Sequence, residues 1–264
     1  MDLQLSDKLV LVTGSTAGIG LAIATAFAAE GARVIVNGRT VGRVDAAIAG
    51  IRQQHPDARL EPLALDLSRA DAADETARRF PDVDILVNNL GVYGPRPFAD
   101  ITDADWLAII ETNFLSGVRL CRHYLPRMTA RGTGRILFIA SESAVNIPVE
   151  MIHYGVTKTM QVALARGLAE GTAGTGVTVN SLLVGPTRSE GVEQFVRDMA
   201  AHGNKTAGEV EAEFFVHVRP SSLLKRFETP EEIAAMAVFL ASPRASGTNG
   251  VAVRVEGGLL RGIL

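Results

Sequence analysis

A tyrosine and a lysine stand four residues apart in the run Tyr154-Gly155-Val156-Thr157-Lys158. On a helix, this spacing places both side chains on one face. A free phenol has a pKa of about 10, and a nearby ammonium stabilises the phenolate and lowers that pKa. Such a hydroxyl can exchange a proton near neutral pH. Taken alone, the pair is more typical of an ordinary helix face than of a catalytic site.

Further polar side chains stand where a reactive site could form. Ser141 follows an apolar run that predicts a strand, thirteen residues before Tyr154, and Asn113 lies within a long predicted helix. The run Asn88-Asn89-Leu90-Gly91 ends another predicted strand. Plainer interpretations remain open. Ser141 could simply end its strand, with Ser143 as the functional hydroxyl, and Asn113 could bond the backbone of its own helix.

A glycine-rich loop, Thr13–Gly20, lies between the first predicted strand and the first predicted helix. Glycines permit a tight turn and a close backbone approach, and the helix N-terminus offers free N–H groups to a pyrophosphate. The hydroxyl groups of Ser15 and Thr16 add possible hydrogen-bond donors to the phosphates. The candidate cofactor residues in this loop are Gly14, Ser15, Thr16, Gly18, Ile19 and Gly20.

The end of the predicted strand at 33–37 bears on the choice of cofactor. A carboxylate there would bind the adenine-ribose hydroxyls and favour NAD, whereas an arginine accommodates the extra phosphate of NADP. The sequence reads Asn37-Gly38-Arg39, without a carboxylate, and Arg39 can contact phosphate through two hydrogen bonds. We therefore expect NADP(H), with NAD(H) as the alternative and a solvated Arg39 as the plain interpretation. Asp66 and Leu67 are candidates for the adenine edge, although Asp66 could equally cap the next helix.

Apolar runs alternate with helical patterns along the chain. The predicted strands are 8–13, 33–37, 60–65, 83–88, 135–140, 177–182 and 251–255, and the predicted helices are 19–30, 41–54, 70–80, 103–131, 151–170 and 230–240. This alternation predicts one α/β domain over residues 1–264, with a doubly wound parallel sheet of about seven strands. The segment Thr187–Lys225 lacks a strand pattern, so it is either a substrate lid or a surface pair of helices.

The composition narrows the class of protein. The 264 residues are 47% hydrophobic and carry a formal net charge of -3, with no basic block to hold a nucleic acid. The single cysteine, Cys121, excludes an internal disulfide and suits a reducing compartment. No stretch is typical of a signal peptide or of a membrane span. We therefore expect a cytoplasmic protein that binds neither nucleic acid nor membrane.

The glycine loop, Asn88–Gly91, Asn113, Ser141 and the Tyr154/Lys158 pair together resemble the short-chain dehydrogenase/reductase family in its single-domain form, over essentially the whole chain. The resemblance implies a Rossmann-type fold and an NAD(P)-dependent oxidoreductase. A homotetramer is also implied, in which the helix with Tyr154, the long helix before it and the tail Val251–Leu264 pair between subunits. A tail folded on its own subunit is the alternative.

The resemblance also implies a role for each residue. Tyr154 would be the general acid in reduction and the base in oxidation, and Lys158 would lower the pKa of Tyr154 and hold the nicotinamide ribose. Ser141 would stabilise charge on the substrate oxygen. Asn113 would kink its helix and hold a water that links Lys158 to solvent. The cofactor would also be bound by Asn89, Gly91, Gly185 and Thr187.

Some positions depart from the family pattern. Leu90 stands where alanine is commoner, which bears on packing beside the nicotinamide. Val184 occupies the usual proline site of the Pro-Gly pair, while Gly185 and Thr187 match. The loop also lacks the basic residue before Gly18 that some NADP-dependent members carry, which weakens the preference for NADP.

The expected substrate pocket is mostly apolar, so an uncharged or amphipathic carbonyl compound is favoured. Its candidates are Tyr93, Pro95, Val145, Ile147, Met151, His153, Phe195, Met199, Phe214, Phe215 and Leu223. The aromatic residues could be ordinary core, and a structural role is favoured for His153. Arg96 and Arg188 either meet an anionic group or are solvated.

An NADP(H)-dependent carbonyl reductase or alcohol dehydrogenase is the leading hypothesis. The alternatives are an NAD-dependent alcohol or sugar dehydrogenase and a non-catalytic dinucleotide sensor, which the presence of all four catalytic candidates disfavours.

Overall fold

The computed structural model describes residues 1–203 and 205–263, apart from the side chain of Phe195. Within these residues, seven strands form one sheet in the order β3-β2-β1-β4-β5-β6-β7, and every neighbouring pair is parallel. The strands are β1 (Leu9–Val12), β2 (Arg33–Gly38), β3 (Arg59–Ala64), β4 (Ile85–Asn88), β5 (Thr133–Ile139), β6 (Gly176–Val184) and β7 (Ala252–Val255). The predicted doubly wound α/β fold is confirmed.

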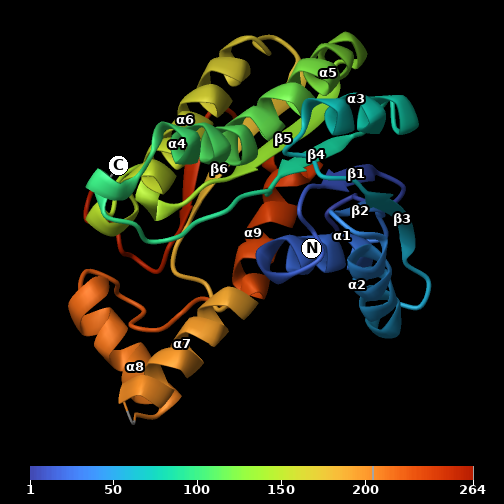
Figure 1. The fold of residues 1–264 in the computed structure, drawn as a ribbon. Coiled ribbons are helices and arrows are strands. Elements are labelled where there is room, and N and C mark those ends of the chain that lie inside the picture. The colour runs from blue at the N-terminus through green and yellow to red at the C-terminus, as the bar shows by residue number, and fades with distance from the viewer. Residues whose placement is uncertain (204, 264) are drawn as a thin grey trace.

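Helices cover both faces of the sheet (Figure 1). The apolar cluster on one face involves α1 (Gly18–Ala29), α2 (Val41–Gln54) and α9 (Pro230–Ala241). The cluster on the other face involves α3 (Ala70–Arg79), α5 (Ser116–Arg131) and α6 (Ile152–Glu170). The predicted long helix at 103–131 is α4 (Asp103–Ile110), a π-helical turn η2 (Glu111–Leu115) and α5 in direct succession. None of the described helices is long and apolar enough to cross a membrane.

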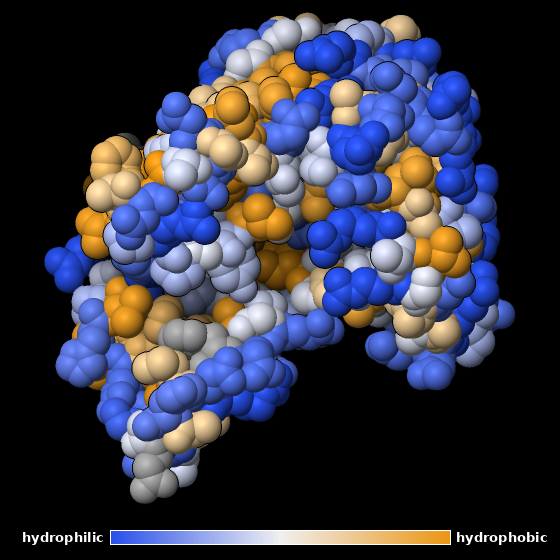
Figure 2. Space-filling model, in the orientation of Figure 1, coloured by the Kyte–Doolittle hydropathy of each residue, from blue (hydrophilic) through white to orange (hydrophobic). Residues whose placement is uncertain are grey.

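The segment 187–225, hereafter the arm, extends away from the sheet (Figure 1). It contains α7 (Glu190–Gly203), α8 (Ala207–Glu213) and a π-helical turn η5 (Phe214–Val218). The arm is therefore a pair of helices, and its service as a lid remains a prediction. It has its own apolar cluster, made of Val196, Val210, Phe215 and, just beyond its end, Phe227. Figure 2 shows the surface hollowed where the arm meets the body.

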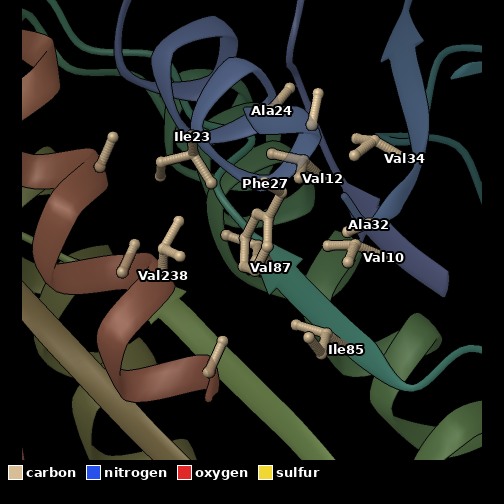
Figure 3. Packing of buried hydrophobic residues seen from close by; sticks show 14 of the residues in the cluster. Val10, Val12, Ile23, Ala24, Phe27, Ala32, Val34, Ile85, Val87 and Val238 are labelled. Carbon is tan, nitrogen blue, oxygen red and sulfur yellow. The ribbon is translucent and has the colours of Figure 1, made fainter. Parts of the chain in front are cut away.

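Phe27 illustrates how α1 is fixed to the sheet. Its side chain is fully buried and packs among valines of β1 and β4, with α9 on the other side (Figure 3). Full burial of a phenylalanine stabilises a fold by about 1.5–3 kcal/mol relative to an exposed one. The glycine loop that precedes α1 therefore sits on a rigid base.

The strand order reverses beside β1, because β2 and β3 lie on one side of it and β4 to β7 on the other. In open parallel sheets, ligands bind outside the carboxyl ends of the strands at such a reversal. The segments that follow β1, β4 and β5 carry the glycine loop, Asn89 and Ser141, so the topology brings these distant motifs to one edge.

Candidate active site

Tyr154 lies in the first turn of α6 and Lys158 lies one turn further along. The Lys158 Nζ is 5.7 Å from the centroid of the Tyr154 ring. Lys158 is buried, and its Nζ donates to the Ile139 carbonyl at 2.8 Å and to Gln161 Oε1 at 3.3 Å. The two residues therefore share one helix face, as their spacing predicts.

The pKa of Tyr154 differs from the expectation. Burial raises it above its usual range, and Glu142 and Tyr93 raise it further, while the nearby Ser141 side chain and the charge of Arg219 lower it. The prediction of a lowered pKa is wrong for this structure, because burial outweighs the stabilising groups. Burial also lowers the pKa of Lys158, to about 8. Both shifts disfavour the charged form, as expected for groups removed from water.

Ser141 follows β5 and is buried beside Tyr154. Its Oγ donates to Glu142 Oε2 at 3.2 Å and accepts from the Ser143 N–H at 3.1 Å. The Ser143 hydroxyl also donates to Glu142 Oε2. Of the two serines, Ser141 is the one whose side chain lowers the pKa of Tyr154, which favours Ser141 over Ser143 for the functional role.

Asn113 is buried within the π-helical turn η2. Its Oδ1 accepts from the Val92 N–H at 2.8 Å, and its Nδ2 donates to the Val92 carbonyl at 2.9 Å and to Thr157 Oγ1 at 3.1 Å. The side chain thus joins the loop after β4 to α6 rather than bonding its own helix. The expected departure from regular helix at Asn113 takes the form of a π-helical turn.

The glycine loop fits the backbone of a dinucleotide. Gly14 and Gly18 have φ values of +62° and +53°, which favour glycine. A Cβ at Gly20 would lie 2.3 Å from the Gly14 oxygen. Ala17, the N-cap of α1, makes no side-chain cap, so the N–H groups of the first helical turn are left for an anion.

Ser15 has a different role from the one predicted. It is fully buried, its Oγ donates to the Val12 carbonyl and accepts from the Asn37 N–H, and its own N–H donates to the Asn37 carbonyl. Its hydroxyl is therefore committed to holding the loop on β2 and is not available to a phosphate. Asn89 also supports the loop, because its Nδ2 donates to the carbonyls of Thr13 and Gly14.

A cleft of about 340 Å³ joins the glycine loop to Tyr154. The predicted site residues that line it are Gly14, Gly18, Ile19, Gly20, Asn89, Gly91, Tyr154 and Lys158. Leu90 and Val184, the two departures from the family pattern, line it as well. Asn113 and Ser141 lie behind its wall, in contact with lining residues: a Cβ at Gly91 would lie 3.6 Å from Asn113 Oδ1.

The predicted adenine end lies outside this cleft. Thr16 packs against the end of β2, since a Cβ at Gly38 would lie 2.4 Å from Thr16 Cγ2. Arg39 follows directly and is exposed, with no hydrogen bond or ion pair to another described residue. Asp66 accepts hydrogen bonds from the Ser68 N–H and hydroxyl, and the N-cap of α3 is Arg69, so the alternative in which Asp66 caps the next helix is wrong.

Leu67, Gly185 and Thr187 lie outside the lining of this cleft, and their contacts with a cofactor stay a prediction. The Leu67 side chain is buried in the core, so only its backbone could reach a cofactor. Gly185 packs on Glu228, and the Thr187 hydroxyl donates to the Gly185 carbonyl. These two residues build the base of the arm. The cleft is instead lined by the next residues along the chain, Ser189, Glu190 and Gly191.

The expected substrate side is built around Tyr93. Its ring packs edge-on against Tyr154, with centroids 6.0 Å apart, and its hydroxyl would lie 3.0 Å from a Cβ at Gly191 of the arm. Several further candidates are exposed apolar side chains: Val145, Ile147, Met199 and Leu223.

Other candidates for the substrate pocket do not line the cleft and make packing contacts or ion pairs elsewhere. His153 is buried and packs edge-on against Trp106, which supports its structural role. Phe214 and Phe215 pack in the arm cluster, and the side chain of Phe195 lies outside the described residues. The arginines are held in ion pairs, Arg96 with Asp105 and Arg188 with Glu211.

The parallel sheet, the glycine loop and the Ser141–Tyr154–Lys158 arrangement place this chain in the class of dinucleotide-binding oxidoreductases. The pattern described as short chain dehydrogenase matches residues 8–200, and the chain belongs to the short-chain dehydrogenase/reductase family. An uncharacterised oxidoreductase of Bacillus subtilis, YvaG, is 47% identical over 263 residues, covering 100% of both chains.

Two relatives carry named activities. The D-beta-hydroxybutyrate dehydrogenase of Cupriavidus necator is 35% identical, covering 97% of this chain and 98% of its own. The L-sorbose reductase of Gluconobacter frateurii, solved with NADPH and L-sorbose, superimposes with a TM-score of 0.90 at 31% identity, covering 100% of both chains.

Sequence reasoning missed several residues that support the site. The Thr13 hydroxyl accepts from the N–H groups of Asn89 and Leu90. Gln161 bonds both Lys158 and the Asn113 carbonyl, and its position one turn after Lys158 was a signal for this contact. Glu142 and Arg219 form a buried ion pair beside Ser141. Arg219 is 77 residues from Glu142, so local sequence gave no signal for that pair.

Proposed function

We propose that this protein transfers a hydride between NADP(H) and a carbonyl or secondary alcohol, with Tyr154 as the general acid or base. The observation that carries the proposal is the cleft that joins the glycine loop to Tyr154 and Lys158. A bound NADPH would supply the hydride in the direction of reduction. The protein then has to orient the reactants and handle one proton.

The first helical turn of α1 would hold the pyrophosphate, and Lys158 and Tyr154 would hold the nicotinamide ribose. In reduction, the Tyr154 hydroxyl donates its proton to the substrate oxygen as negative charge develops there. Ser141 donates a hydrogen bond to the same oxygen once its hydroxyl turns from Glu142. Asn113 acts indirectly, by holding the loop after β4 against α6.

The raised pKa of Tyr154 keeps this residue protonated at neutral pH. A protonated phenol is the form that reduction requires, whereas oxidation requires the phenolate. We therefore propose that reduction is favoured near neutral pH and that oxidation rises in alkaline solution. Loss of the Lys158 charge above about pH 8 adds a fall in reduction on the alkaline side.

The preference for NADP(H) over NAD(H) rests on Arg39, which directly follows β2, is exposed and makes no hydrogen bond or ion pair with another described residue. A charge-assisted contact with the 2′-phosphate would be lost in Arg39→Ala. The Kd for NADPH should rise about tenfold or more, while the Kd for NADH should change little. Cofactor fluorescence measures both constants. Equal effects on the two cofactors would assign this enzyme to the NAD(H) alternative or to dual use.

The substrate is a carbonyl or alcohol that fits beside Tyr93. Named relatives act on hydroxybutyrate, L-sorbose and D-threitol, so these compounds and their carbonyl or alcohol partners belong in the first panel. NADPH consumption across this panel, with the alcohol product quantified, tests the reaction class. Ser141→Ala should lower kcat with little change in the Kd for NADPH. Tight NADPH binding with no turnover of any compound would favour the sensor hypothesis.

We also propose a cytoplasmic homotetramer. The chain's only cysteine, Cys121, is buried, and NADP(H) is an intracellular cofactor. In the C-terminal tail, Leu259 is buried on its own subunit, whereas Ile263 is 98% exposed and available to a partner. Light scattering after size exclusion would measure the mass. A monomer would support the alternative in which the tail serves its own subunit.

A further inference from the structure

A buried ion pair joins the arm to the segment that carries the proposed catalytic residues. Arg219 Nε lies 2.9 Å from Glu142 Oε1, and the side chains are only 11% and 4% exposed. Arg219 directly follows the π-helical turn of the arm, and Glu142 directly follows Ser141. Charged groups with so little access to water are costly to bury unless they are paired.

Arg219 contacts the same segment at a second point. Its Nη1 lies 3.4 Å from Glu150 Oε1. Glu142 and Glu150 both lie between Ser141 and Tyr154, in the 3-10 turns η3 (Glu142–Ala144) and η4 (Val149–Met151). One side chain of the arm therefore bonds both turns of the connection between the two proposed catalytic residues.

The other carboxylate oxygen of Glu142 faces the serines. Oε2 accepts from the Ser141 hydroxyl and from the Ser143 hydroxyl. A hydroxyl has one proton to donate, so the contact with Glu142 uses the only proton of the Ser141 hydroxyl. Arg219 holds one oxygen of this carboxylate and thereby fixes where the other one points.

We propose that Arg219 and Glu142 are positioning residues, which couple the arm to Ser141 and Tyr154 and set the charge around the proton donor. The proposal rests on the proposed function. The groups around Tyr154 that carry or can acquire charge are Glu142, Arg219, Tyr93 and Lys158. Glu142 raises the pKa of Tyr154 and Arg219 lowers it, so each half of the pair has an effect of opposite sign.

Single variants should therefore move the pH profile in opposite directions. The profile is kcat/KM for oxidation by NADP⁺ of the alcohol that corresponds to the best carbonyl of the panel. Arg219→Met should shift its midpoint to higher pH by about half a unit or more, because the buried carboxylate is left uncompensated. Glu142→Gln should shift it to lower pH by a similar amount. The double variant should return close to the wild-type midpoint.

Two further variants separate charge from folding. Arg219→Lys keeps the charge but loses the two-point contact, so it should keep the midpoint and lower kcat. Lys205→Met breaks an exposed ion pair with Glu213 elsewhere in the arm and should leave the profile unchanged. Circular dichroism checks that each variant is folded. If Arg219→Met does not fold, the double variant compared with Glu142→Gln still gives the effect of the Arg219 charge. If Glu142→Gln does not fold, the double variant compared with Arg219→Met gives the effect of the Glu142 charge.

Hydrogen–deuterium exchange tests, without any substrate, whether Arg219 couples the arm to the segment between Ser141 and Tyr154. Arg219→Met should increase exchange in residues 141–154, whereas Lys205→Met should not. Unchanged exchange in this segment, or losses of activity with no shift of the midpoint, would overturn the proposal. Activity retained in Tyr154→Phe would instead overturn the proposed function, so the two failures are distinguishable.

Discussion

Lys158 is an ammonium held in a buried site at a cost to stability. Burial lowers its pKa from 10.5 to about 8, a difference that corresponds to about 3 kcal/mol between the two protonation states. Between these two values, the unfolded chain binds more protons than the folded one. Stability should therefore rise with pH across this window, as the penalty for burying the charge is relieved.

Lys158→Met removes this dependence. The variant loses the hydrogen bonds to Ile139 and Gln161 at every pH, which is a constant offset. Relative to the variant, the wild type should gain about 1.4 kcal/mol by pH 9 and about 2.5 kcal/mol by pH 10, measured from pH 7.

Urea unfolding followed by circular dichroism, at pH 7, 8, 9 and 10, gives the free energy of unfolding for both proteins. Lys205→Met serves as the control for removal of an exposed lysine, since that side chain is 40% exposed. Its difference from wild type should stay constant over this range. A constant difference for Lys158→Met as well would refute the lowered pKa and, with it, the expected alkaline fall in reduction.

Two other substitutions test the glycine loop and the base of the arm. Gly20→Ala places a Cβ 2.3 Å from the Gly14 oxygen, so the Kd for NADPH should rise about tenfold or more in a folded protein. An unchanged Kd in a fluorescence titration would contradict the role of the glycine loop. Glu228→Gln concerns the base of the arm, where burial raises the pKa of Glu228 to about 7. The stability that this raised pKa contributes is fully present below the ordinary pKa of 4.5 and is lost as pH rises through 7. The Tm of Glu228→Gln should therefore rise relative to that of the wild type from pH 5 to pH 8. A Tm difference that does not depend on pH would refute the raised pKa of Glu228.

Much of this fold is visible in the sequence because local pattern and tertiary position agree. Apolar runs such as Leu9–Val12 and Ile85–Asn88 are buried on both faces of a parallel sheet, so they lack a polar alternation and read as strands. The glycine loop and the Tyr154/Lys158 pair are local too. A strand-to-helix turn and one face of a helix are enough to define them.

The remaining features depend on contacts between distant segments. Ser15 has the residue type of a phosphate donor, but its hydroxyl is consumed by Val12 and Asn37 once β1 and β2 pair. The sign of the pKa shift at Tyr154 depends on how deeply α6 is packed, which spacing along one helix does not reveal. The contact of Arg219 with Glu142 requires the end of the arm to lie against the turn that follows β5, a placement that neither segment reveals by itself.

The central claim is that Tyr154 is the proton donor, and a comparison of two tyrosine variants tests it most directly. Tyr154→Phe and Tyr124→Phe each remove one hydroxyl, and the Tyr124 hydroxyl donates to the Phe80 carbonyl in the core, outside the cleft. At saturating NADPH, with the best carbonyl of the panel, Tyr154→Phe should lower kcat by about 10²–10⁴-fold while the Kd for NADPH stays near the wild-type value. Tyr124→Phe should keep kcat near wild type. Comparable turnover in the two variants would contradict the assignment of Tyr154.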